Sequence, residues 1–261
     1  MNIAKKRIEW NGGRQQEGID ILLRKGQTIV SPTKVGYIIM TSDASGLKRK
    51  FLAKQRALNK PAVVLCGSME QLRELAEMNG EIETLYQNAW DNDILLGCIL
   101  PWKEGAKRHI PADGSEAMMM DDRGTSCFVI KFGVPSEIIV RELWADHGKV
   151  VFASSANPSG KGNSGRIDGI GERIQNDADL VIAADDYVRS IQRGATENTR
   201  YEQGVMVSMV DAGGKLVPQQ KGQRSIQPRP TVIRKGLDIE RIMSMLSDLF
   251  PSWDYRQGAY Y

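Results

Sequence analysis

Short apolar runs alternate with amphipathic stretches along most of the chain. The runs are rich in Val, Ile and Leu, have the length of strands, and end in Gly, Pro or polar residues. They predict strands at residues 28–31, 62–66, 94–100, 127–132, 150–154, 180–184 and 205–210. Because helical patterns separate several of these runs, the order of elements is typical of an α/β sheet with helices packed on it.

Helical spacing of apolar residues predicts helices in the body of the chain at 17–26, 69–78 and 135–148. The first pattern stops at Gly26 and the last at Gly148. A glycine directly after a helix adopts the left-handed conformation at little cost, so both glycines are expected to end their helices.

The C-terminal region predicts one more helix, with Asp238 as its N-cap. Its apolar positions follow one face: Ile239, Ile242, Met243, Leu246 and Phe250. We therefore expect one α/β domain over 1–236, with the helix and the aromatic tail of 237–261 packed on it. Two aperiodic stretches rich in Gly, Pro and charge, 101–125 and 211–230, are expected to be mobile loops.

The composition is that of an ordinary soluble globular protein, with 41% hydrophobic and 26% charged residues in a chain of 261. A net charge of +3 is too small at this length to indicate nucleic-acid binding by itself. The N-terminal residues lack the apolar segment of a signal peptide, and the longest apolar runs are far shorter than a membrane span. We therefore expect a cytoplasmic protein that makes no membrane contact.

Cysteine and histidine are scarce. Cys66, Cys98 and Cys127 lie in separate apolar runs, and neither their number nor their spacing fits a disulfide framework or a zinc site. We expect three buried, reduced thiols. His109 and His147 are the only histidines, which argues against a Ser-His-Asp triad or a His-rich metal site.

The stretch VVFASSANPSGKGN at 150–163 changes abruptly from apolar to small polar residues. Turns are made of such residues, so an ordinary strand end is one interpretation. The other is a ligand site, where hydroxyls and amides face an anion and the backbone approaches it closely. Taken alone, the stretch leaves both interpretations open.

The segment SGLKRKFLAKQRALNKP at 45–61 carries six basic residues and no acidic one. We interpret the cations at 48–50 as a solvated helix face. Lys54 instead shares the apolar side of the helix with Phe51, so its charge either snorkels or points into a cavity. If the helix ends near Lys54, an extended K-x-R places Lys54 and Arg56 on one side, which suits a triphosphate or a carboxylate.

Several motifs follow one another in a specific order: PT-x-x-GY at 32–37, K-x-R-x-x-x-K-P at 54–61, SSANPSG at 154–160, S-M-V-D at 208–211 and I-R-K-G at 233–236. In this order they resemble the YrdC family, whose members make threonylcarbamoyl-adenylate for tRNA modification. PTKVGY is closest to the form seen in the YciO branch, and the resemblance covers about residues 26–236. It implies a twisted, mixed open sheet with flanking helices around a large basic cavity.

The resemblance implies a nucleotidyl transfer. L-Threonine and bicarbonate give an N-carboxy amino acid, whose carboxylate attacks the α-phosphate of ATP and releases pyrophosphate. Lys54 and Arg56 would be the catalytic residues, holding the triphosphate and the amino-acid carboxylate. Positioning and charge neutralisation at phosphorus suffice for this chemistry, which needs no histidine or cysteine nucleophile.

The remaining site residues follow from the same motifs. The resemblance implies nucleotide binding by Lys54, Arg56, Ser155, Asn157, Ser208 and Arg234, and substrate binding by Thr33, Tyr37, Arg56 and Ser155. Mg²⁺ would arrive with ATP, without a metal site of the protein's own. The partners implied are small-molecule substrates, with tRNA or tRNA-modification proteins beside them. With these motifs together, we favour the ligand-site interpretation of 150–163.

Four features depart from the family pattern. Lys34 and Val35 follow Pro-Thr where threonine-using members have an acidic residue and Thr or Ser; Leu65 stands for a histidine, Gly97 for a threonine and Lys131 for an arginine. Most of these changes touch the acceptor side, so adenylate chemistry is a stronger inference than L-threonine. The alternatives are a divergent carbamoyl-adenylate-forming enzyme that uses another acceptor or carbamoyl phosphate, and a non-catalytic RNA-binding module.

Overall fold

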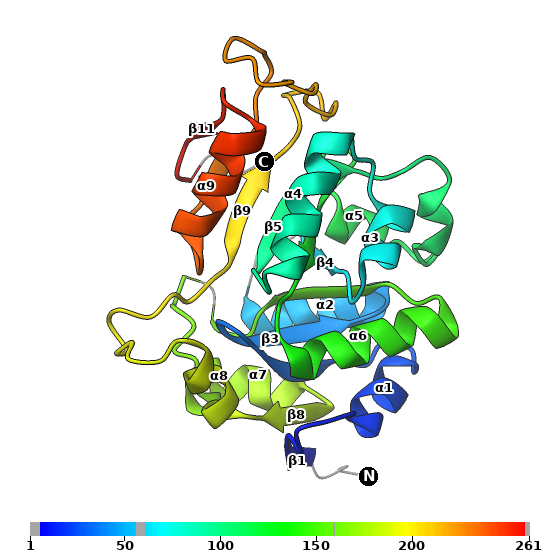
Figure 1. Cartoon of the computed structure of the whole chain (residues 1–261). Coiled ribbons are helices and arrows are strands. Elements are labelled where there is room, and N and C mark those ends of the chain that lie inside the picture. The colour runs from blue at the N-terminus through cyan, green and yellow to red at the C-terminus, as the bar shows by residue number, and fades with distance from the viewer. Residues whose placement is uncertain (1–5, 56–60, 159, 259–261) are drawn as a thin grey trace.

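The computed structural model describes residues 6–55, 61–158 and 160–258. Strands within these ranges are β1 Lys6–Glu9, β2 Ile29–Thr33, β3 Gly36–Thr41, β4 Val63–Leu65, β5 Leu96–Pro101, β6 Thr125–Ile130, β7 Val151–Ser155, β8 Leu180–Ala183, β9 Val205–Ser208, β10 Thr231–Arg234 and β11 Asp254–Tyr255. They form one sheet in the order β1-β8-β2-β3-β7-β4-β6-β5-β9-β10-β11. The edge strands β1 and β11 lie at opposite ends of the molecule (Figure 1).

The sheet is mixed. Pairing is antiparallel for β2–β3, β3–β7, β7–β4, β6–β5 and β9–β10. It is parallel for β1–β8, β8–β2, β4–β6, β5–β9 and β10–β11. This confirms the expected α/β class and the mixed open sheet. All of the strands predicted from apolar runs are present, each within two residues of its predicted ends.

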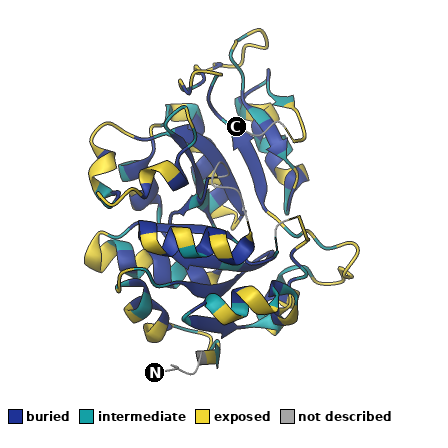
Figure 2. Ribbon diagram, turned by 180° about the vertical axis from the view of Figure 1, so that it is seen from behind, coloured by how far each residue is buried: buried dark blue, intermediate teal, exposed yellow. Residues whose placement is uncertain are grey.

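Helices flank the sheet. They are α1 Gln16–Leu22, α2 Ala44–Lys54, α3 Met69–Leu75, α4 Gly80–Asp91, α5 Glu116–Met119, α6 Val134–His147, α7 Glu172–Asp177, α8 Asp185–Ile191 and α9 Ile239–Leu249, with short 3-10 helices η1 Ala106–His109 and η2 Ile167–Ile170. Figure 2 shows the sheet largely buried, with the outward sides of the helices exposed.

The two faces of the sheet are covered unequally. On one face, α2, α3, α4 and α9 pack over β4, β6, β5 and β9 in a single large core. On the other face, α1 and α6 cover β2, β3, β7 and the end of β4. Side chains alternate along a strand, so each of the middle strands contributes to both faces. Where the cover of α1 and α6 stops, the second face is left open for a cavity.

The ends of the helices correct two expectations. Gly148 follows α6 in the left-handed conformation, as predicted. Gly26 does not end α1, because that helix stops at Leu22 and Gly26 lies in the turn beyond it. Asp238 does precede α9, but its side chain makes no capping hydrogen bond and forms an ion pair with Arg241 instead.

The loop prediction for 101–125 was wrong. The segment contains η1 and α5, and it places Ile110 and Met118 in the core beside α3. Its apolar residues stand among Gly, Pro and charged residues and keep no single period through the segment, which hid their burial from the sequence. Residues 211–230, in contrast, hold no helix or strand, as expected.

The C-terminal region is part of the same core. Ile242, Leu246 and Phe250 are buried, and α9 packs against α4. The aromatic tail, in which no motif was found, supplies β11, and Figure 1 shows it beside α9. The three cysteines are buried free thiols, as predicted. Among the described residues, no helix has both the length and the apolarity to cross a bilayer.

Candidate functional site

A cavity of about 510 Å³ lies on the open part of the second face. Its floor is a row of registered neighbours across β4, β6, β5, β9 and β10: Leu65, Val129, Gly97, Met206 and Arg234. The row starts with aliphatic side chains and ends with a guanidinium. The order of strands in the sheet therefore places an apolar surface directly beside a cation.

The second cation of the cavity is Lys54, at the end of α2. The helix stops there because Gln55 adopts the left-handed conformation, with a φ of 51°. Lys54 is 3% exposed and lines the cavity. Its ammonium donates to the carbonyl oxygens of Ser155 and Asn157, and Ser155 Oγ lies 3.3 Å from Nζ. The prediction that Lys54 points into a cavity is consistent with this placement.

The turn after β7 has features of both a ligand site and an ordinary strand end, the two interpretations of 150–163. Ser155 and Asn157 line the cavity, as a ligand site requires. The Asn157 amide also donates to the Lys161 carbonyl, which is ordinary turn chemistry. Asn163 accepts from Tyr37 N and donates to Tyr37 O, so it ties the turn to β3.

The glycine of the PT-x-x-GY motif allows Asn163 to approach β3 closely. A Cβ at Gly36 would lie 2.1 Å from Asn163 Oδ1, and the φ of Gly36 is 127°. Only glycine fits there. Thr33 lines the cavity but is 2% exposed, and its hydroxyl donates to the Gly36 carbonyl.

Two predicted site residues lie outside the cavity lining. Ile38 lines the cavity, so alternation along β3 turns Tyr37 to the opposite face, where its hydroxyl donates to Asp185 Oδ1 at 2.6 Å. Burial, and then the bond to Asp185, raise the pKa of Tyr37. Ser208 lies two residues beyond Met206 along β9, and its hydroxyl donates to the Val210 carbonyl. We correct the assignment of Tyr37, because its side chain faces away from the cavity. Ser208 lies on the same face of β9 as Met206 but beyond the lining of this cavity, so its role in nucleotide binding stays a prediction.

Arg56, the other half of the K-x-R motif, lies outside the described residues. Arg234 lines the cavity, and its Nε donates to the Gly204 carbonyl at 3.0 Å. Of the residues named from motifs, the structure thus brings Lys54, Ser155, Asn157, Thr33 and Arg234 to one cavity.

Residues 200–204 form a wall that the motifs did not indicate. Arg200 donates to the Asn163 carbonyl, and Gly204 accepts from Arg234, so the segment joins the two polar ends of the cavity. Glu202 and Gln203 line the cavity from this wall, and Lys161 lines it from the turn. Glu202 and Gln203 lie in a loop without a motif, so no sequence signal pointed to them, whereas Lys161 belongs to the stretch 150–163 interpreted as a ligand site. Among the described lining residues, three cations face one carboxylate, consistent with the expected basic cavity.

The basic stretch before Lys54 is less solvated than expected. Lys48 is exposed, as predicted. Arg49 forms ion pairs with Asp177 and Asp179, the latter at 2.8 Å. Lys50 is 1% exposed, and its Nζ lies 4.3 Å from the centre of the Phe51 ring. The interpretation of 48–50 as a solvated face was therefore wrong for Lys50, whose side chain is buried.

Two of the departures from the family pattern meet in one charge cluster beside the cavity. Lys34 Nζ lies 2.8 Å from Asp93 Oδ2, and Lys131 Nζ lies 3.6 Å from Asp93 Oδ1. Glu137 accepts from the Gly133 N–H nearby. Burial raises the pKa of Glu137, opposed by that N–H and by the charges of Lys131 and Lys34. The two lysines thus serve the packing of this corner, and neither lines the cavity.

Comparison with known proteins gives the family. The chain matches the model of the Sua5–YciO–YrdC family, which carries the description "Telomere recombination", over residues 21–194. The chain belongs to this family, which confirms the resemblance drawn from the motifs. Among the described residues, no three His, Cys, Asp or Glu side chains are grouped as metal ligands would be.

Similar proteins were found among curated sequences and solved structures. Threonylcarbamoyl-AMP synthase of Pyrococcus abyssi (strain GE5 / Orsay) is 24% identical over 226 residues, which are 85% of this chain and 61% of the relative. The chain thus spans about three-fifths of the length of that relative. The crystal structure of a hypothetical protein, smu.1377c of Streptococcus mutans UA159, is 60% identical, with a TM-score of 0.93, and the match covers 98% of this chain and 100% of that one. YciO of E. coli shares the fold, with a TM-score of 0.60 and 16% identity over 89% of this chain and 95% of that one.

Proposed function

We propose that the chain is an ATP-dependent enzyme of the threonylcarbamoyl-adenylate synthase type. It joins a carbamoylated amino acid to AMP and releases pyrophosphate. The observation that carries the proposal is the cavity itself, where Lys54 and the turn 155–157 stand at one end of an apolar floor and Arg234 at the other. The family and the name of the Pyrococcus abyssi relative support the same chemistry.

In the proposed reaction, the amino nitrogen of the acceptor bonds to the carbon of bicarbonate, a C–O bond of bicarbonate breaks, and water leaves with the proton from the amine. An oxygen of the new carboxylate bonds to the α-phosphorus of ATP, the bond from that phosphorus to the bridging oxygen breaks, and pyrophosphate leaves with the electron pair. Lys54 and Arg56 would stabilise the negative charge on the phosphates. Ser155 and Asn157 would position the reacting groups, with Arg234 at the nucleotide and Thr33 at the acceptor.

The substrates are then ATP, entering with Mg²⁺, bicarbonate and an amino acid. Threonine is the acceptor in the name of the Pyrococcus abyssi relative, and tRNA modification in the cytoplasm, with tRNA or tRNA-modification proteins as partners, is the setting we propose. Support for that setting comes from the family alone.

The test is release of pyrophosphate from ATP and bicarbonate with a panel of amino acids, and separately with carbamoyl phosphate. Lys54→Met keeps the aliphatic stem of the side chain and removes the charge, so we expect release to fall at least about 100-fold. Lys48→Met, on the exposed side of the same helix, is the matched control and should retain release. Equal release by wild type and Lys54→Met, or silence of the wild type with every substrate, would exclude the proposed function.

A further inference from the structure

We propose that the acceptor is an amino acid with an aliphatic side chain, bound on the apolar floor next to Lys54. The inference rests on the proposed function, which it makes specific. Leu65 and Val129 form the apolar end of the floor, and Val35, Val63 and Phe132 line the cavity together with them. None of these side chains carries a hydrogen-bonding group.

Backbone carbonyls of the floor already accept hydrogen bonds from other parts of the chain. The Val129 carbonyl accepts from the Cys66 N–H at 2.9 Å, and the Phe132 carbonyl accepts from the Lys34 N–H at 2.9 Å. The Thr33 hydroxyl, the nearest polar group of the motif, donates to the Gly36 carbonyl and accepts from the Val35 N–H. A hydroxyl on the acceptor would therefore lose its water without gaining a partner on this floor.

The floor begins beside the reacting groups. Val63 pairs with Ala153, two residues before Ser155 on the same strand face. At about 3.3 Å per residue, this is roughly 7 Å from Ser155 along the strand. Leu65 pairs with Val151, two residues further from Ser155. An acceptor whose carbamoyl carboxylate lies near Lys54 and Ser155 therefore places its side chain against Val63.

The far part of the floor is closed by packing. A Cβ at Gly97 would lie 3.0 Å from Cys127 Sγ and 3.3 Å from Val129 Cγ2. The space that a side chain at position 97 would need is thus occupied by a thiol and a methyl group. No polar side chain can enter the floor from this strand without displacing them.

L-Valine and L-threonine give the sharpest comparison, because they have the same shape and differ by a methyl in place of a hydroxyl. An apolar site rejects the hydroxyl-bearing isostere by up to about 100-fold, whereas a site that hydrogen-bonds the hydroxyl rejects the analogue without it more strongly still. Tighter binding of L-valine than of L-threonine would therefore indicate an apolar floor, and tighter binding of L-threonine would indicate a floor that hydrogen-bonds the hydroxyl.

The experiment is calorimetric titration of L-valine and of L-threonine into the full chain, saturated with bicarbonate and the α,β-methylene analogue of ATP. We expect L-valine to bind at least about 10-fold more tightly. Equal or tighter binding of L-threonine, or binding of neither, would overturn the inference. Because this readout needs no turnover, it is separate from the pyrophosphate assay that decides the proposed function.

Variants at Val63 make the test residue-specific. Val63 is half-buried, so its side chain can be changed without opening the core. Val63→Thr puts a hydroxyl in place of a methyl and should bring the ratio of affinities for valine and threonine towards one or invert it. Val63→Ile, the matched apolar control, should preserve the preference for valine. An unchanged ratio in Val63→Thr, in a chain whose thermal unfolding shows it to be folded, would contradict the assignment of this floor to the acceptor.

Discussion

The strands β4, β6 and β5 have two faces: one is buried in the core and the other lines the cavity. On one, Val64, Phe128 and Cys98 are fully buried under α3 and α4. On the other, Leu65, Val129 and Gly97 form the floor of the cavity. Each residue of the first set is the chain neighbour of one in the second, because successive side chains of a strand point to opposite faces.

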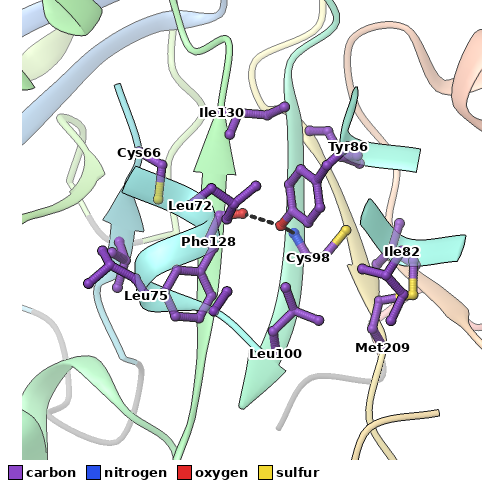
Figure 3. Packing of buried hydrophobic residues seen from close by; sticks show 14 of the residues in the cluster. Cys66, Leu72, Leu75, Ile82, Tyr86, Cys98, Leu100, Phe128, Ile130 and Met209 are labelled. Carbon is purple, nitrogen blue, oxygen red and sulfur yellow. Dashed lines mark hydrogen bonds between the residues drawn. The ribbon is translucent and has the colours of Figure 1, made fainter. Parts of the chain in front are cut away.

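The polar groups on the two surfaces differ as well. On the core face, the Tyr86 hydroxyl donates to the Phe128 carbonyl at 2.8 Å and accepts from the Cys98 N–H at 3.1 Å, as Figure 3 shows. Beside the cavity, the charges of Lys34, Asp93 and Glu137 lie close together. The core face thus fixes the strands in place, while three residues that depart from the family pattern, Val35, Leu65 and Gly97, line the cavity.

The largest effect should come from the adjacent valines of β4. Val64→Ala opens a cavity in the dry core and should lower the free energy of unfolding by about 2–3 kcal/mol. Val63→Ala, on the half-buried cavity side, should lower it by less than about 1 kcal/mol. Urea unfolding of both variants measures the difference. Equal losses would mean that the two faces are packed alike.

The next effect concerns Tyr86. Tyr86→Phe leaves a buried N–H and a buried carbonyl without this partner, and we expect a loss of about 1–2 kcal/mol in the free energy of unfolding. Tyr255→Phe, whose hydroxyl bonds to Gln257 at the exposed end of the sheet, is the control and should change stability little. A Tyr86→Phe variant as stable as wild type would show that the Tyr86 hydroxyl does not stabilise the core face.

The smallest effect is a pH dependence at the charged corner. Because the pKa of Glu137 is raised in the folded chain, its contribution to stability is present at low pH and is lost as the pH rises through the raised value. Relative to Glu137→Gln, the wild type should therefore lose stability as the pH rises above about 4. Unfolding series of both chains across this range measure it, with the exposed Glu104→Gln as control. A parallel course of wild type and Glu137→Gln would contradict the raised pKa.

The sequence predicted the strands well and the site in part. Apolar runs located the middle strands because buried strands need such runs, and the motif residues Lys54, Ser155, Asn157 and Arg234 do meet at one cavity. Tyr37 was misplaced because a motif does not show on which face of its strand each residue lies.

Other features had little or no sequence signal. The wall at 200–204 lies in a loop, where contacts such as Arg200 to Asn163 depend on how distant segments meet. The floor had a signal only at Leu65 and Gly97, which depart from the family pattern. Nothing in the sequence showed that Leu65, Val129, Gly97 and Met206, from four separate strands, form one row. Their alignment depends on the strand order, which alternation of apolar runs does not reveal.

The most direct measurement is to identify the product formed from ATP, an amino acid and ¹³C-labelled bicarbonate. We expect an AMP conjugate of the carbamoylated amino acid that carries the label, together with pyrophosphate. This product should be lost in Lys54→Met but not in Lys48→Met. Formation of ADP and phosphate, or of an AMP product without the label, would contradict the proposed function.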